Sequence, residues 1–405
     1  MEKTRSDFPI LKRMVHGKPL VYLDNAATTQ IPLQVLEAVE THYWRYNSNI
    51  HRGIHSLSES STAMIEHARD VIREFIGADD AGEVVFTSGA TQSINLVAGS
   101  YRESLRPGDE VLVSGMEHHS NLCPWQNACR CSGAELKVIP VDDRGNLKID
   151  EYESMVTDRT KLVAVTYCSN VLGTVNPIHE IVGIAHEKGA RVLVDAAQAM
   201  RHVNIDVKIM DCDFLCFSGH KIMGPYGTGV LYGKQRALEE LRPVNFGGGM
   251  VDTVTWEKTV KGELPFRLEA GTINISGITG LEAAIQYLLK LGISKIAVYE
   301  KNLLKYAEEC LRTIGGVHLF GSPARRAGVL SFILDDFHHY DTAMMLDKLG
   351  IAVRSGHLCA QPLLSRFGLP GVVRMSPAFY NTKREIEKFV NGIEKIISLT
   401  ARKTA

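Results

Sequence analysis

Cysteine is scarce in this sequence, which also lacks a long hydrophobic run and an excess of charge of one sign. Eight cysteines in 405 residues are too few for a disulfide scaffold, so we expect reduced thiols. The formal net charge of −1 gives no electrostatic reason to expect nucleic acid or an anionic membrane as a partner. Residues 1–7 lead into no apolar segment, which predicts no signal peptide. Because no run approaches the roughly 18 apolar residues of a membrane span, the sequence predicts a soluble, cytoplasmic protein.

A metal site is not predicted either. Cys123, Cys129 and Cys131 lie close together, but their spacing is not that of the usual zinc sites. His51 and His55 are separated by one helical turn, yet a glycine stands between them and no third ligand is evident. We therefore interpret the three cysteines as helix residues and expect no metal.

The rest of the composition, 45% apolar and 22% charged, is that of a globular protein with a sizeable core. A chain of 405 residues has room for two or three domains of about 100–200 residues each. Apolar runs alternate with amphipathic stretches through the first half, which is typical of βαβ units and a parallel sheet in an α/β fold. The elements expected there are strands 110–114, 135–140, 161–167 and 191–195 and helices 58–76 and 178–188.

The second half shows a different pattern. Residues 243–280 are glycine-rich and are predicted to form a long, functional loop. Two helices are expected next, over about 280–291 and 294–314. The remaining residues, roughly the last hundred, are predicted as α+β, with strands 328–334, 351–354 and 372–375 and helices 341–349 and 383–398.

One lysine stands where a buried strand is expected to end. Residues 212–217 form a short apolar run, and the chain then breaks into small and polar residues around Lys221 before Gly224-Pro225. Desolvation at such a place lowers the pKa of a lysine, and a neutral amine can attack a carbonyl group. Taken alone, however, this stretch favours a lysine that extends to the surface.

A carboxylate ends the preceding apolar run, because residues 191–194 lead directly to Asp195. If both strands belong to one parallel sheet, Asp195 and Lys221 emerge at the same carboxyl edge, where ligands bind in open α/β sheets. A lysine that bonds to an aldehyde and a carboxylate near a pyridinium nitrogen are the two groups that pyridoxal phosphate chemistry requires. A lone aspartate at a strand end is more often a cap. The prediction of pyridoxal phosphate therefore depends on the pair.

Further strand ends carry polar groups. A glycine turn precedes a helix that begins near Ala90, and the free N–H groups of a helix start suit a phosphate. His118 follows strand 110–114 and Asn170 follows strand 161–167, although an ordinary polar loop is the simpler explanation of each taken alone. Cys359 lies in a polar loop that includes Arg354, and a thiol near cationic groups ionises more readily.

Three motifs lie in order along the chain: Val194-Asp195-Ala196-Ala197-Gln198, Phe217-Ser218-Gly219-His220-Lys221-Ile222-Met223-Gly224-Pro225 and Arg354-Ser355-Gly356-His357-Leu358-Cys359-Ala360-Gln361-Pro362. Together they resemble the cysteine desulfurases, above all the SufS branch with its selenocysteine-lyase-like relatives. The resemblance runs from Asp7 to Thr382. It implies a fold-type I, pyridoxal-phosphate-dependent transferase with a large, mostly parallel-sheet domain over residues 21–292. A smaller α+β domain over residues 293–405 would carry the catalytic cysteine loop, and residues 1–20 would pack with it.

The resemblance also implies a role for each matching residue. The catalytic groups would be Lys221, which anchors the cofactor and takes the substrate Cα proton, His118, which stacks on the cofactor ring, and Cys359, the sulfur nucleophile. Two positions depart from the pattern: Ala90 stands where relatives often carry threonine, and Leu358 where some carry a second histidine. Besides Lys221 and His118, the cofactor would be held by Thr91, Asp195, Gln198, Ser218, His220 and, across a subunit boundary, Thr272. The substrate would be held by Asn170, Arg354, Arg374 and His51.

The activity implied is conversion of L-cysteine to L-alanine with a persulfide left on Cys359, which supplies sulfur for iron–sulfur cluster assembly. The implied partners are a sulfur-acceptor protein of the SufE or SufU kind and a second copy of the chain, which the loop 243–280 would reach. Selenocysteine lyase, acting on L-selenocysteine, stays open as an alternative. An aminotransferase or kynureninase-like hydrolase is disfavoured because neither needs a nucleophilic thiol. Intact Lys221 and Asp195 disfavour a non-catalytic sulfur carrier or assembly scaffold.

Overall fold

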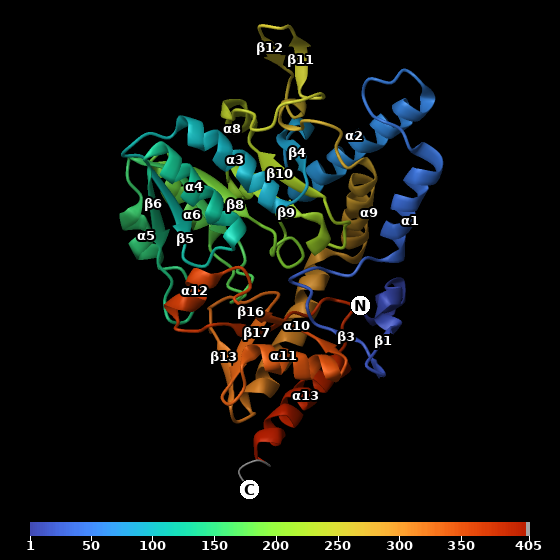
Figure 1. Cartoon of the computed structure of the whole chain (residues 1–405), viewed down its shortest axis with the longest axis vertical. Coiled ribbons are helices and arrows are strands. Elements are labelled where there is room, and N and C mark those ends of the chain that lie inside the picture. Colours follow the sequence, from blue (N-terminus) through green and yellow to red (C-terminus); the bar gives the residue numbers. More distant parts are fainter. Residues whose placement is uncertain (402–405) are drawn as a thin grey trace.

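The computed structural model describes residues 1–401, whose arrangement is drawn in Figure 1. No helix in this range is both long and apolar enough to cross a membrane. The helices are α1 (Leu33–Thr41), α2 (Ser56–Ile76), α3 (Ala90–Ser104), α4 (Cys123–Ser132), α5 (Ile149–Met155), α6 (Ile178–Glu187), α7 (Val207–Met210), α8 (Gln235–Glu240), α9 (Ile275–Leu291), α10 (Ile293–Arg312), α11 (His339–Lys348), α12 (Gln361–Arg366) and α13 (Lys383–Ala401). The strands are β1 (Met14–Val15), β2 (Lys18–Pro19), β3 (Val21–Tyr22), β4 (Val84–Thr87), β5 (Glu110–Ser114), β6 (Glu135–Ile139), β7 (Thr160–Thr166), β8 (Arg191–Asp195), β9 (Phe214–Ser218), β10 (Gly229–Gly233), β11 (Val251–Val254), β12 (Thr259–Lys261), β13 (Val317–Phe320), β14 (Leu330–Leu334), β15 (Ile351–Ala352), β16 (Arg354–Gly356) and β17 (Val372–Met375).

A seven-stranded sheet in the order β4-β10-β9-β8-β7-β5-β6 forms the centre of the upper part of the molecule in Figure 1. Strand β10 is antiparallel to both β4 and β9, whereas the other neighbouring pairs are parallel. All strands of this sheet except β10 therefore run in one direction. Their carboxyl ends meet at one edge, as the alternation of elements in the sequence predicts.

Helices cover both faces of this sheet. Leu162 and Ala164 of β7 belong to a core shared with α3 and α4, whereas Val163 and Val165 belong to the larger core that includes residues of α2, α6 and α9. Successive side chains of a strand point to opposite faces. Because both faces are buried, the central strands are continuously apolar.

Several predicted elements of the first half are confirmed to within two residues. The helix predicted over 58–76 is α2, and Gly77 ends it in the left-handed conformation with φ 73°. The strands predicted over 110–114 and 191–195 are β5 and β8, and the three clustered cysteines lie on α4. The apolar run at 212–217 becomes β9, which starts at Phe214 and leads to Lys221 through a 3-10 turn at residues 219–221.

A second, four-stranded antiparallel sheet has the order β13-β14-β17-β16. Helix α13, predicted over 383–398, packs in the same core, with Ile386, Phe389 and Ile393 fully buried beside residues of α10. The prediction of one continuous strand over 351–354 is wrong. The chain leaves β15, which pairs with β3, and enters β16, which pairs with β17, so the two halves belong to different sheets.

The glycine-rich segment 243–280 is also not the uninterrupted loop that was predicted. It contains the hairpin β11–β12, and helix α9 begins within it, at Ile275. The hairpin projects from the body of the molecule (Figure 1), and Trp256 at its turn is fully exposed. Because an exposed hairpin buries no apolar face, its strands lack the alternation by which strands are recognised in a sequence.

The N-terminal segment contacts elements far along the chain. Phe8 packs its ring against Tyr287, Phe379 and Tyr380, and Arg5 pairs with Glu385 at 2.8 Å. Strand β3 pairs in parallel with β15, so a strand at the start of the predicted large domain joins one from the predicted small domain. The division into two domains between residues 292 and 293 stays a prediction. The last four residues of the predicted small domain, 402–405, lie outside the described range.

Candidate active site

Loops at the carboxyl edge of the large sheet enclose a cavity of about 230 Å³. Residues after β4, β5, β7, β8 and β9 line it, together with β16, β17 and the loop before α12. All of the predicted site residues except His51 and Thr272 lie there: Thr91, His118, Asn170, Asp195, Gln198, Ser218, His220, Lys221, Arg354, Cys359 and Arg374.

Lys221 and Asp195 come from neighbouring parallel strands, since Asp195 is paired with Cys216 across β8 and β9. Burial lowers the pKa of Lys221, although the nearby Asp195 carboxylate acts in the opposite direction. Burial likewise raises the pKa of Asp195 against the influence of Lys221. The Ala197 N–H donates to Asp195 Oδ1 at 2.9 Å and holds the carboxylate in place. Desolvation therefore favours the neutral, nucleophilic form of the amine.

The start of α3 and the end of β9 form a polar cradle. The Ala90 N–H donates to Ser218 Oγ at 2.9 Å, and the first turn of α3 brings Thr91 to the cavity wall. Two backbone segments approach closely here, since a Cβ on Gly229 of β10 would lie 2.3 Å from the Cα of Gly89, which precedes α3. His220 stacks on Tyr226, and its buried Nδ1 has no hydrogen-bond partner among residues 1–401. A helix N-terminus with hydroxyl groups beside it suits an anion.

Arg374 reaches the cavity from β17 and is buried. Its Nη1 donates to the Asn170 carbonyl at 2.9 Å, and its Nη2 donates to Asp24 Oδ1 at 3.2 Å. Arg354 approaches the other oxygen of Asp24 at 3.4 Å. Burial raises the pKa of Asp24, although both arginines act against it. Sequence reasoning gave Asp24 no role, although it ends an apolar stretch in the same way as Asp195.

The Cys359 loop is held from two sides. The Asn170 side-chain amide donates to the Leu358 carbonyl at 2.7 Å, and the His119 N–H donates to the Cys359 carbonyl at 2.7 Å. Leu358 and Cys359 both have left-handed backbone conformations, with φ of 54° and 56°, which non-glycine residues rarely adopt. Leu358 packs into the largest core, whereas Cys359 is exposed. The structure thus leaves Cys359 accessible at the cavity while its neighbour anchors the loop.

Sequence reasoning also missed a buried ionic group behind Lys221. Arg201 Nε donates to the Lys221 carbonyl at 3.1 Å, and its Nη1 contacts Glu300 of α10 at 2.6 Å. Glu300 accepts the Phe379 N–H at 2.9 Å and lies 2.8 Å from His202 Nδ1. No motif marks these residues, because Arg201 follows β8 whereas Glu300 lies on α10, and only the folded chain brings them together. The group ties the backbone of Lys221 to the segment that follows Arg374.

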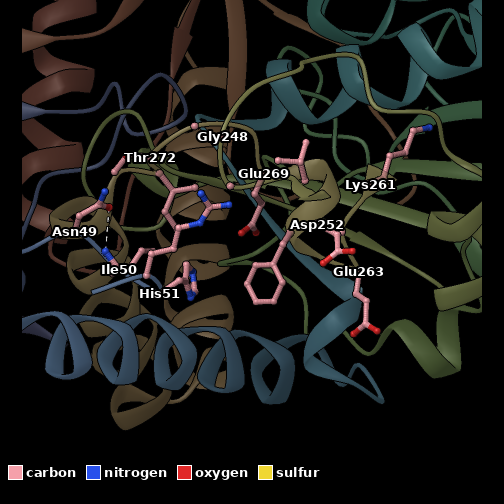
Figure 2. A pocket seen from close by; sticks show the side chains of 16 residues that line it. Asn49, Ile50, His51, Gly248, Asp252, Lys261, Glu263, Glu269 and Thr272 are labelled. Carbon is pink, nitrogen blue, oxygen red and sulfur yellow. Dashed lines mark hydrogen bonds between the residues drawn. The ribbon is translucent and has the colours of Figure 1, made fainter. Parts of the chain in front are cut away.

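His51 and Thr272 lie elsewhere, at a larger cavity of about 820 Å³. Figure 2 shows Asn49, His51 and Thr272 at one end of it and Lys261 and Glu263 at the other. Both His51 and Thr272 are exposed, and the His51 ring lies 5.1 Å from that of Phe266. Within one chain, the structure does not bring these two residues to Lys221. In the part of the chain that the structure describes, no group of three or more His, Cys, Asp or Glu residues is arranged to hold a metal ion.

Comparison with known proteins places this architecture in a family. The model for aminotransferase class V matches residues 21–389. A protein from Synechococcus elongatus named cysteine desulfurase is 48% identical over 98% of this chain, which spans only 63% of that protein's length. A cysteine desulfurase from Salmonella agona is 47% identical, and the match covers 98% of both chains. The apo structure of a cysteine desulfurase from Thermococcus onnurineus NA1 superposes with a TM-score of 0.93 at 38% identity over 98% of each chain.

The large, mostly parallel sheet and the paired Lys221 and Asp195 at its carboxyl edge define a fold-type I enzyme of the pyridoxal-phosphate-dependent class. The chain belongs to the aminotransferase class-V family.

Proposed function

We propose that this protein is a cysteine desulfurase, which removes sulfur from L-cysteine, releases L-alanine and keeps the sulfur as a persulfide on Cys359. The observation that carries the proposal is that an exposed cysteine shares one cavity with the Lys221–Asp195 pair. A transaminase would need no thiol there. The names of the relatives from Salmonella agona and Thermococcus onnurineus support the same activity.

The residues of the cavity fit pyridoxal phosphate. Lys221 would bond to its aldehyde, Asp195 would face its pyridine nitrogen, and His118 would lie against its ring. Gln198, whose amide donates to the Ala26 carbonyl at 2.7 Å, would approach the ring hydroxyl. When bound, the cofactor would withdraw electrons from the substrate Cα. The phosphate would occupy the cradle formed by Thr91, Ser218 and His220.

The chain's own residues then divide the remaining work. Arg374, Arg354 and Asn170 would bind the substrate carboxylate, which would share the guanidinium of Arg374 with Asp24. Lys221, once free, would accept the Cα proton. The Cys359 thiolate would attack the substrate sulfur, so that an S–S bond forms and the C–S bond breaks. The electron pair of the broken bond stays on carbon, which takes up a proton and leaves as the methyl group of alanine.

The proposed activity is tested by measuring alanine and the cofactor together. Purified protein should show a visible absorption band that borohydride abolishes, and with L-cysteine it should form alanine together with protein-bound sulfur. Borohydride-treated protein is the matched control, since its lysine can no longer exchange with substrate. Pyruvate or a keto acid in place of alanine would show a different reaction of the same cofactor. Comparing L-cysteine with L-selenocysteine decides between the desulfurase and the lyase.

We further propose that the protein works as a homodimer with shared sites, supplies sulfur for iron–sulfur clusters in the cytoplasm, and passes it to an acceptor protein of the SufE or SufU kind. Thr272 supports the dimer, because it is exposed and lines a cavity away from its own Lys221 (Figure 2). In a dimer, Thr272 and His51 would complete the partner's site. The exposed Trp256 on the projecting hairpin also suits burial against a second copy.

A mixed dimer tests the shared site. Thr272→Asp should weaken cofactor binding because its carboxylate would face the partner's phosphate, and Lys221→Ala should be inactive. When the two variants are co-expressed, random pairing should restore about one quarter of the wild-type activity, since only one site of each mixed dimer is intact. A Lys221→Ala chain that also carries Thr272→Asp is the control, and mixing it with Lys221→Ala should restore nothing. A fully active monomer in sedimentation would contradict the proposal.

A further inference from the structure

Ser120 lies between Thr91 and His118, two residues that line the cavity proposed for the cofactor, and sequence reasoning gave it no role. It belongs to the short 3-10 turn at residues 119–121 that follows β5. Its hydroxyl lies 2.7 Å from Thr91 Oγ1 and 3.1 Å from His118 Nδ1, and its backbone N–H donates to the same Nδ1 at 3.1 Å. A single residue therefore contacts both the start of α3 and the imidazole.

The contact with the backbone decides which nitrogen of His118 carries hydrogen. A peptide N–H can only donate, so Nδ1 must accept with its lone pair and cannot itself be protonated. The ring is neutral, because burial and the nearby Lys221, His119 and Arg374 hold the pKa of His118 at about 3. The remaining ring hydrogen is then on Nε2. His118 thus offers an N–H donor at Nε2.

The turn that holds Ser120 is itself fixed. Glu117, next to His118, is buried and accepts hydrogen bonds from the Asn121 side chain at 2.7 Å and from the Thr166 N–H at 2.7 Å. Asn121 in turn accepts from the Trp125 indole of α4 at 3.0 Å. These bonds join β5, β7 and α4 around the turn. The backbone N–H of Ser120 is therefore held in place, because Glu117 before it and Asn121 after it are both fixed by these bonds.

The Ser120 hydroxyl has an effect of its own. Since the one lone pair of Nδ1 already accepts the Ser120 N–H, the closer Thr91 Oγ1 is the acceptor for the Ser120 hydroxyl hydrogen. The Thr91 hydroxyl is then free to donate its own hydrogen toward the cavity. This matters because Ala90, the preceding residue, has no hydroxyl to offer.

We propose that Ser120 is a positioning residue that makes two groups of the cofactor site donors: its N–H fixes His118 as the Nε2–H form, and its hydroxyl turns the Thr91 O–H toward the phosphate. The proposal deepens the proposed function and rests on it for the identity of the phosphate. It also assigns roles: with hydrogen held on Nε2, His118 donates to the bound ligand, and removal of the Cα proton is left to Lys221.

Nitrogen NMR of histidine-labelled, full-length protein tests the first part. His118→Gln identifies the His118 signals among those of the 15 histidines. We expect Nε2 to show a directly bonded hydrogen and Nδ1 to show none, both with cofactor and after its removal. Ser120→Ala should leave this pattern unchanged because it keeps the backbone N–H. Hydrogen on Nδ1, or on both nitrogens, at neutral pH would overturn this part.

Cofactor binding to protein stripped of its cofactor tests the second part. Ser120→Ala should raise the dissociation constant of pyridoxal phosphate roughly 10- to 150-fold, as for loss of one hydrogen bond to a charged group. It should leave pyridoxal, which lacks the phosphate, unaffected. In a Thr91→Ala background the same substitution should add nothing, because Ser120 acts through Thr91. Ser154→Ala, an exposed hydroxyl on α5, is the control.

Two outcomes would overturn the role of the hydroxyl: an equal loss for pyridoxal, or additive losses in the double variant. These results are distinguishable from failure of the proposed function. A protein that forms alanine from cysteine but carries hydrogen on Nδ1 of His118 contradicts only the inference about Ser120. A protein with the expected nitrogen spectrum that forms no alanine contradicts only the desulfurase activity.

Discussion

Lys221→Ala should abolish turnover and the borohydride-sensitive absorption while leaving the fold intact. Among residues 1–401, Lys221 is the one lysine that lines the cavity with Asp195, so the substitution removes both the covalent anchor and the proposed base at Cα. Loss of a general base alone costs about 10²–10⁴-fold in rate, and loss of the anchor adds to it. The fold should survive, because the removed amine is one that burial already disfavours in its charged form.

The measurement is the absorption spectrum before and after borohydride, together with alanine formation from L-cysteine. Circular dichroism and thermal unfolding show whether the fold persists. Lys208→Ala is a matched control, since Lys208 is half-exposed and pairs with Asp79 on the surface; it should keep full activity. If Lys221→Ala retained the borohydride-sensitive band, another lysine would be the anchor and the assignment of the site would be wrong.

Cys359→Ser should eliminate the first burst of alanine from L-cysteine while the cofactor spectrum stays unchanged. The loop is held by Asn170 and by the His119 N–H, so the thiol stays at the cavity. The few residues between β16 and α12 could reach only about 3.3–3.6 Å each even if fully extended. Sulfur should therefore remain on Cys359 until an acceptor thiol enters. Turnover on cysteine alone should be slow after the burst and faster with an acceptor protein or a small reductant.

Rapid-quench measurement of alanine, with and without acceptor, checks this prediction. Cys123→Ser is the control, because Cys123 is also exposed but does not line the Lys221 cavity, and it should keep the burst. Cleavage of L-selenocysteine is expected to survive in Cys359→Ser, since the C–Se bond is weaker than C–S. Fast, steady turnover with no burst and no effect of acceptor would contradict the persulfide mechanism.

The sequence was sufficient for the features that depend on local pattern. Apolar runs that end in Asp195 or lead to Lys221 predict buried strands with polar groups at their ends. Alternation with helices predicts that those ends share one edge. Burial of the strands on both faces is what makes their apolar runs continuous, so the large sheet was recognisable without coordinates. The exposed hairpin β11–β12 has no such run and was missed.

The contacts that shape the candidate site were decided by the tertiary structure. Arg374 and Asp24 stand at opposite ends of the chain and meet because Asp24, after β3, forms a β-bridge with Ser376, which directly follows β17. Arg201, which donates to the Lys221 carbonyl, meets Glu300 only because the fold brings α10 next to it. Even Ser120, which had no predicted role, and Thr91, which had one, come together through the packing of α3 against the turn after β5. A sequence pattern reports which side chains are buried and where strands end, whereas the partner of a buried polar group depends on which distant segments the topology brings within hydrogen-bond distance.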